Sequence, residues 1–181
     1  MIEISFLGGE LALALFWLAV RLVLALVRGR VDWKREALLL LMYINLAVIL
    51  RITFYPMRRA AGQVQPLLFD PAAVWPFRVN LVPFRQLFNY ASKRVLLLNV
   101  IGNAAMFIPT GILLPILDRR LDSFWKVVGA GALISLCIEL LQLPFAVRAS
   151  DVDDLLLNTL GVALGYGIYA LFTKRRGRDE A

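Results

Sequence analysis

The sequence predicts an all-α fold, a polytopic bundle of about five transmembrane helices in a single membrane domain over residues 1–181. Of the 181 residues, 60% are hydrophobic, whereas soluble domains average about 45–50%. These hydrophobic residues fall into five blocks of roughly 20 residues, the length that a helix needs to cross a bilayer. Because lipid offers the backbone no hydrogen bonds, segments of this length are expected to be helical.

The five predicted spans cover residues 6–27, 37–56, 95–117, 124–145 and 152–172. An irregular segment, 57–94, separates the second span from the third. Its prolines, Pro66, Pro71, Pro76 and Pro83, argue against a long helix. Its aromatic run WPFRVNLVPF (75–84) suits the headgroup layer. We interpret this segment either as a loop that anchors the fold or as a flap over a site.

Basic residues in the connections predict the orientation. Segments 28–36, 118–126 and 173–181 together hold 11 Lys and Arg, against six in the longer segment 57–94 and one in 146–151. Since Lys and Arg concentrate in cytoplasmic loops, we expect the C-terminus inside and the N-terminus and segment 57–94 outside. The net charge of +7 is then a topology signal, and we expect no nucleic-acid partner.

The composition also excludes several chemistries. The chain has no histidine, and Cys137 is its only cysteine. This excludes a Ser-His-Asp triad, Cys-His catalysis and Cys/His zinc sites. The candidate functional groups that remain are carboxylates, amides, hydroxyls, Tyr, Lys and Arg. We expect no cofactor and no bound metal.

Polar residues follow one face of each of the last three spans, because residues three and four apart share a helix face. With the predicted orientation, all of them fall near the outer ends of their helices, and Asn103 and Asn158 lie about 10–12 Å inside the outer boundary. The sequence therefore predicts a polar intramembrane pocket that opens to the outer leaflet. Its side chains are Asn99, Asn103, Glu139, Gln142, Asp151, Asp154 and Asn158.

Several of these features also have purely structural interpretations. Ser150 and Asp153 fit an N-cap of the fifth helix and its acidic first turn. Gly161 and Gly165 form a GxxxG pair, which is typical of close helix packing. Asn99 and Asn103 could equally be hydrogen-bonding residues between helices.

Three charged residues within the spans need a partner or a route to water. Arg21 is expected to extend its side chain to the cytoplasmic interface. Arg51 either extends to the outer interface or neutralises Glu139. Glu139 lies too deep to be free, so we expect either a buried pair or a functional site.

Four ordered motifs resemble those of the VanZ-like membrane proteins. They are NLVPF (80–84), NVIGNAAMFIPTGILLP (99–115), SLCIELLQ (135–142) and RASDVDDLLLNTLGVALGY (148–166). The resemblance extends over about residues 80–166, and it implies a small multi-pass protein of the bacterial inner membrane. The family is named for a member associated with resistance to teicoplanin, a lipid-bearing glycopeptide antibiotic. The resemblance adds Asn80 and Arg148 to the candidate binding residues.

Three functions are compatible with these residues. The first is binding of membrane lipids, a lipid-linked cell-wall intermediate or a lipoglycopeptide antibiotic, with Arg148 as a partner for anions. The second is an intramembrane enzyme that acts on a lipid-linked substrate, with Glu139 and Asp154 as catalytic residues and Asp151 with Asp154 as ligands for a hard cation. The third is a transporter. We rank it last, because five spans without an internal repeat offer little machinery for alternating access.

Overall fold

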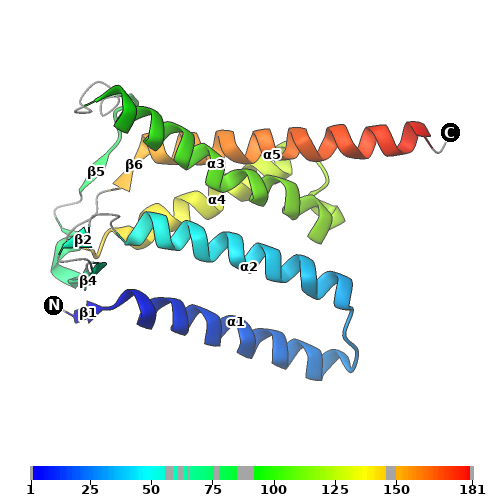
Figure 1. Ribbon diagram of the computed structural model, residues 1–181, viewed down its shortest axis with the longest axis horizontal. Coiled ribbons are helices and arrows are strands. Elements are labelled where there is room, and N and C mark those ends of the chain that lie inside the picture. The colour runs from blue at the N-terminus through cyan, green and yellow to red at the C-terminus, as the bar shows by residue number, and fades with distance from the viewer. Residues whose placement is uncertain are drawn as a thin grey trace. The chain divides into compact units, whose positions relative to one another are not determined.

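Five long helices make up most of the protein (Figure 1). The structure is a computed structural model that describes residues 2–55, 59–60, 63–64, 66–75, 78–84, 92–145 and 150–179. The helices are α1 (Phe6–Arg28), α2 (Trp33–Phe54), α3 (Lys93–Leu117), α4 (Phe124–Gln142) and α5 (Val152–Asp179). Each contains a segment long and apolar enough to cross a membrane. The predicted all-α class with five spans is therefore confirmed.

The connecting segments contain short strands and turns. Strands β1 (Ile2–Ile4) and β4 (Leu67–Phe69) pair antiparallel, as do β2 (Arg59–Ala60) and β3 (Gln63–Val64). Strands β5 (Val79–Asn80) and β6 (Ser150–Asp151) pair in parallel. Two 3-10 turns, η1 (Pro71–Val74) and η2 (Arg119–Leu121), complete the elements. The described part of segment 57–94 thus has no long helix, as its prolines predict.

Contacts along the chain divide it into two compact units. The first unit comprises Met1–Arg78 with Gln142–Arg148, and the second comprises Val79–Leu141 with Ala149–Ala181.

In the first unit, α1 and α2 form a hairpin joined by a short turn (Figure 1). Gly29 ends α1 in the left-handed conformation, with φ 63°, and the Asp32 carboxylate caps α2 by accepting from two backbone N–H groups. The rings of Trp17 and Tyr43 lie 5.1 Å apart, centroid to centroid, between the two helices.

An ion pair also joins this hairpin. The guanidinium of Arg21 donates two hydrogen bonds to the carboxylate of Glu36. Arg21 thus extends toward the turn between the two helices, the direction that was expected, and pairs there with a carboxylate of the neighbouring helix. The location of this turn at the cytoplasmic interface stays a prediction.

In the second unit, α3 and α5 run side by side and pack through glycines (Figure 1). A Cβ at Gly161 would lie 2.0 Å from the carbonyl oxygen of Ala104, and one at Gly165 would lie 2.1 Å from that of Ile108. Gly111 meets the carbonyl oxygen of Val162 in the same way, at 2.2 Å. The backbones touch directly, which confirms the packing interpretation of the GxxxG pair.

Candidate functional site

A two-residue strand pair brings the loop before α3 to the start of α5. Asn80 of β5 pairs with Asp151 of β6, and the Asn80 side-chain amide donates to Asp151 Oδ1 at 3.0 Å. A parallel pair of this length joins segments about 70 positions apart without any local sequence signal. Asn80, expected only from the family resemblance, therefore contacts one of the predicted carboxylates.

The first turn of α5 makes a second contact with the loop before α3. The backbone N–H of Phe84 donates to Asp153 Oδ1 at 2.7 Å, and Phe84 adopts φ 65°. The left-handed conformation is uncommon for a residue with a side chain and costs free energy, so the hydrogen bond to Asp153 helps to hold it. Asp153 is 5% exposed.

Asp151 caps α5, and Ser150 does not. Asp151 Oδ1 accepts from the backbone N–H of Asp153 at 3.0 Å, whereas the Ser150 hydroxyl donates to Glu139 at 3.0 Å. The N-cap interpretation of Ser150 is therefore wrong. Ser150 lies in β6, before the helix begins at Val152, and its hydroxyl is directed to a buried carboxylate of α4.

Glu139 is 4% exposed and accepts two hydrogen bonds, both on Oε2. One comes from the Ser150 hydroxyl, and the other comes from the backbone N–H of Asp151 at 3.0 Å. The expectation that Glu139 lies buried is confirmed. In the described part of the chain, no Lys or Arg forms an ion pair with Glu139, Asp151 or Asp153.

Two asparagines of α3 contact the same end of α5. The side-chain amide of Asn103 donates to Asn99 Oδ1 at 3.0 Å and also to Asp154 Oδ1. The helical spacing of four residues places Asn99 and Asn103 on one face, as predicted. This face meets the carboxylate of Asp154, so α3 and α5 are joined by hydrogen bonds as well as by glycine packing.

Asn158 lies one turn deeper and is 1% exposed. Its amide nitrogen donates to the hydroxyl of Ser135 on α4 at 2.9 Å. Its Oδ1, like Oδ2 of Asp153, is buried and has no hydrogen-bond partner among the described residues. Most buried polar atoms in proteins have such a partner, so these two acceptors require an explanation.

Of the other two predicted site residues, one has its described partner elsewhere and one lies outside the described residues. Gln142 belongs to the first unit, where its amide donates to the carbonyl oxygen of Thr53 at 2.9 Å. Arg148 lies outside the described residues.

We call the hydrogen-bonded polar side chains of the second unit, described above, the polar cluster. It is rich in acceptors, because its four carboxylates only accept hydrogen bonds when ionised, and its four amides and two hydroxyls carry acceptor oxygens as well. Such a set is complementary to hydroxyl, amide or ammonium groups of a ligand. Among the described residues, no group of three or more Asp, Glu, Cys or His side chains is placed to hold a metal ion. The cluster consists of Asn80, Asn99, Asn103, Ser135, Glu139, Ser150, Asp151, Asp153, Asp154 and Asn158.

Ser135, Ser150 and Asp153 are members that the sequence reasoning did not place in the site. Ser135 lies on the same predicted face as Glu139, four residues earlier, so the helical period already indicated it. Ser150 and Asp153 gave only the signal of a helix cap, because their partners come from distant segments.

A model of a known protein family matches this part of the chain. A family model described as VanZ/LLP1 matches residues 38–173, which include the whole polar cluster. Protein VanZ of Enterococcus faecium is 32% identical over 102 residues, which are 56% of this chain and 58% of that protein. The chain thus spans little more than half the length of this curated relative. No solved structure matches the chain.

Proposed function

We propose that this chain, which belongs to the VanZ/LLP1 family, is a multi-pass protein of the bacterial cell membrane that binds the polar part of an amphiphile at the polar cluster. The amphiphile is a polar lipid, a lipid-linked cell-wall intermediate or a lipoglycopeptide antibiotic. The observation that carries the proposal is the convergence of carboxylates and amides from α3, α4 and α5, with two buried acceptors left without a described donor.

The free-energy cost of this cluster supports a ligand. Carboxylates of membrane-spanning helices need partners or a ligand to offset their removal from water, and the cluster contains four acidic residues. An unsatisfied buried acceptor costs about 1–3 kcal/mol. Hydroxyl or N–H groups of a bound headgroup would satisfy Asn158 Oδ1 and Asp153 Oδ2. Helix packing alone needs no such group, because the glycines of α5 already provide close contact with α3.

The proposed orientation has the N-terminus outside and the C-terminus in the cytoplasm. Glu139 lies three residues before the end of α4, and Asp154 lies two residues after the start of α5. At 1.5 Å per residue, each is within about 5 Å of its helix end. In this orientation those helix ends face outward, so the cluster would be open to molecules of the outer leaflet.

The family name suggests the first ligand to test. The relative in Enterococcus faecium is named Protein VanZ, and we propose that this chain contributes to resistance against teicoplanin-type antibiotics or has an envelope role with a related lipid-linked molecule. Both roles require recognition of a polar group that is attached to an acyl chain. The polar cluster would bind this polar group while the acyl chain of the ligand stays in the lipid.

The experiment compares teicoplanin susceptibility and membrane abundance in cells that express the wild-type chain or variants. Asn103→Ala and Glu139→Gln should return susceptibility to that of cells without the protein, at unchanged abundance. Matched controls are Glu10→Gln, a half-buried carboxylate of α1, and Thr159→Ala, whose hydroxyl donates to the Leu155 carbonyl of its own helix. Both controls should keep the wild-type phenotype.

Two outcomes would count against the proposal. A large loss of abundance in Asn103→Ala and Glu139→Gln, absent from the controls, would make the cluster structural. Wild-type susceptibility in both cluster variants would show that these side chains bind nothing needed for resistance.

A second candidate is an intramembrane enzyme, favoured by the geometry of Glu139. Both of its described hydrogen bonds end on Oε2, which leaves Oε1 available to accept a proton from a substrate. Purified protein would then turn over a lipid-linked substrate, and Asp154→Asn would abolish that turnover while the protein remains folded. Retained turnover in Asp154→Asn would exclude the assigned role of this carboxylate.

A further inference from the structure

A second site lies in the first unit, at the turn between α1 and α2. A cavity of about 440 Å³ opens there, which we call the basic cavity. Four arginines line it, Arg21, Arg28, Arg30 and Arg35, together with the carboxylates of Asp32 and Glu36. Ligand pockets are typically about 300–1,000 Å³, so the cavity has the size of a small headgroup.

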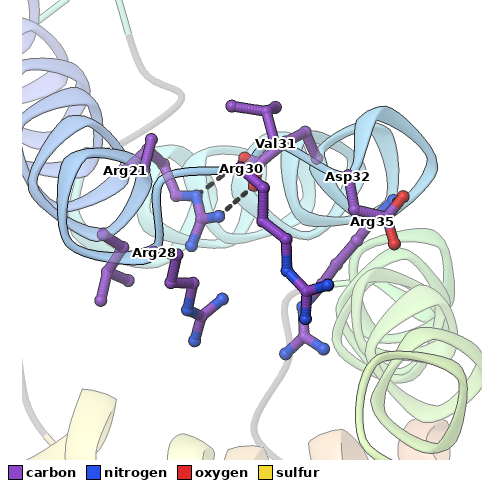
Figure 2. Close-up of a pocket in the computed structure, with 9 residues that line it drawn as sticks. Arg21, Arg28, Arg30, Val31, Asp32 and Arg35 are labelled. Atoms are coloured by element: carbon purple, nitrogen blue, oxygen red, sulfur yellow. Dashed lines mark hydrogen bonds and ion pairs between the residues drawn. The ribbon is translucent and has the colours of Figure 1, made fainter.

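The two carboxylates are already engaged. Glu36 accepts both hydrogen bonds from Arg21, and Asp32 accepts the backbone N–H groups of Lys34 and Arg35 at the start of α2. No carboxylate forms an ion pair with Arg28, Arg30 or Arg35 among the residues that the structure describes. Figure 2 shows the side chains of these three arginines extending to the same side of the hairpin, while Arg21 turns to its partner.

An apolar groove of about 470 Å³ adjoins the basic cavity. The two share Arg21, Ala25, Val31 and Glu36 in their linings. The rest of the groove is apolar and comes from both helices, with Trp17, Leu18 and Leu22 on α1 and Trp33 and Leu40 on α2. A basic cavity that continues into an apolar groove along two membrane-spanning helices matches a molecule with an anionic head and an acyl chain.

We infer that the basic cavity and the apolar groove together bind one anionic phospholipid, with its phosphate among Arg28, Arg30 and Arg35 and an acyl chain between Trp17 and Trp33. Guanidinium groups form bidentate hydrogen bonds with phosphate oxygens. Basic pockets between transmembrane helices are a known form of anionic-lipid site. This site is distinct from the polar cluster, because all of its lining residues belong to the first unit.

The alternative is that these arginines serve only to orient the hairpin during insertion, as any basic connection does. That role requires positive charge near the turn. It does not require the arginines to share a cavity with an apolar groove, and it predicts no preference for anionic over zwitterionic lipid in that groove.

Trp17 and Trp33 provide the readout. In the full chain with Trp75→Phe and Trp125→Phe, the remaining tryptophans line the groove. This protein is placed in phosphatidylcholine vesicles in which a small fraction of the lipid is replaced by brominated phosphatidylglycerol or by brominated phosphatidylcholine. Bromine on the acyl chain quenches only a tryptophan that it contacts, so the assay reports a chain in the groove and does not respond to a free anion.

The wild-type arginines should give stronger quenching by the brominated phosphatidylglycerol. Each basic residue near a headgroup contributes about fivefold, which is about 1 kcal/mol. Arg30→Gln should therefore lower the preference about fivefold, and this residue lies in the turn outside both helices. The combined Arg28→Gln, Arg30→Gln and Arg35→Gln variant should show no preference.

The matched control, Arg119→Gln with Arg120→Gln and Lys126→Gln, removes three positive charges from η2 and the first turn of α4. It should keep the wild-type preference. Equal quenching by the two brominated lipids in the wild-type chain would overturn the proposal. So would an equal loss of preference in the control, since the effect would then be one of net charge. Absence of quenching by either lipid would also overturn it, by showing that protein covers the groove.

Discussion

Close contact between α3 and α5 predicts that Gly161→Ala destabilises the protein, whereas Gly167→Ala does not. A Cβ at Gly161 would lie 2.0 Å from the carbonyl oxygen of Ala104, while a Cβ at Gly167 has nothing within 4 Å. Carbon–oxygen contacts in proteins are about 3.3–3.6 Å. The two helices would therefore have to separate by more than about 1 Å, because no rotamer can move a backbone carbonyl.

The expected loss of stability is the difference in the free energy of unfolding between Gly161→Ala and Gly167→Ala. Both replace glycine by alanine within α5, so the gain in helix propensity of about 1 kcal/mol cancels in the comparison. The remaining cost is that of overpacking, about 1–3 kcal/mol. We expect the upper part of this range, since the obstructing atom belongs to the backbone.

The assay is reversible unfolding of the purified chain in mixed micelles as the fraction of denaturing detergent rises, followed by circular dichroism. The free energy of unfolding of Gly161→Ala should fall below that of Gly167→Ala by the stated amount. Equal free energies would refute the reasoning, because the helices would then have room for a methyl group at this position.

Three further predictions concern orientation, the ion pair and the polar cluster. The orientation can be tested in a chain in which Cys137→Ser removes the native cysteine. Ser92→Cys should then react with a membrane-impermeant maleimide on intact cells, and Asp122→Cys should not. The reverse pattern would show that the orientation is inverted. Glu36→Gln should lower the free energy of unfolding by about 1–3 kcal/mol, since the Arg21 guanidinium loses charge-assisted hydrogen bonds. The double variant Arg21→Glu with Glu36→Arg should restore part of the lost free energy in the same unfolding assay. Asn158→Leu should change the free energy of unfolding by less than about 1 kcal/mol, because the lost hydrogen bond to Ser135 is offset by removal of the unsatisfied Oδ1. It should nevertheless abolish the teicoplanin phenotype, and retained resistance would contradict its role in binding.

Hydropathy predicted the spans well because the requirement for apolar side chains applies to every position in lipid. It was less informative at the helix ends. Helix α2 begins at Trp33, where the carboxylate of Asp32 caps it, although Lys34, Arg35 and Glu36 are charged. Helix α4 ends at Gln142, although the three following residues, LPF, are apolar. Caps and prolines decide the ends of helices, and they act independently of hydrophobicity.

Helical spacing predicted part of the polar cluster for a similar reason. The period of the helix fixes which residues share a face, so Asn99 and Asn103 were expected together, and Asp154 was expected on the face that meets them. The contacts made by Ser150 and Asp153 depend on a two-residue strand pair and on a left-handed turn at Phe84. Neither has a periodicity, so the sequence alone could not indicate them.

Gln142 shows the limit of the same argument. It shares the predicted face with Glu139, yet its amide reaches the carbonyl oxygen of Thr53 in the first unit. Spacing places a side chain on a face but does not choose among the polar groups that the face meets. Arg21 is a similar example, since nothing in its own span indicates that Glu36 lies opposite.

Native mass spectrometry of the gently purified chain tests the central claim most directly. If the polar cluster binds an amphiphile, the wild-type protein should carry a bound molecule of defined mass that Thr159→Ala retains and Asn103→Ala loses, with both variants folded. A wild-type protein that carries no such molecule, or an identical bound mass in Asn103→Ala, would contradict the claim that these side chains form a binding site.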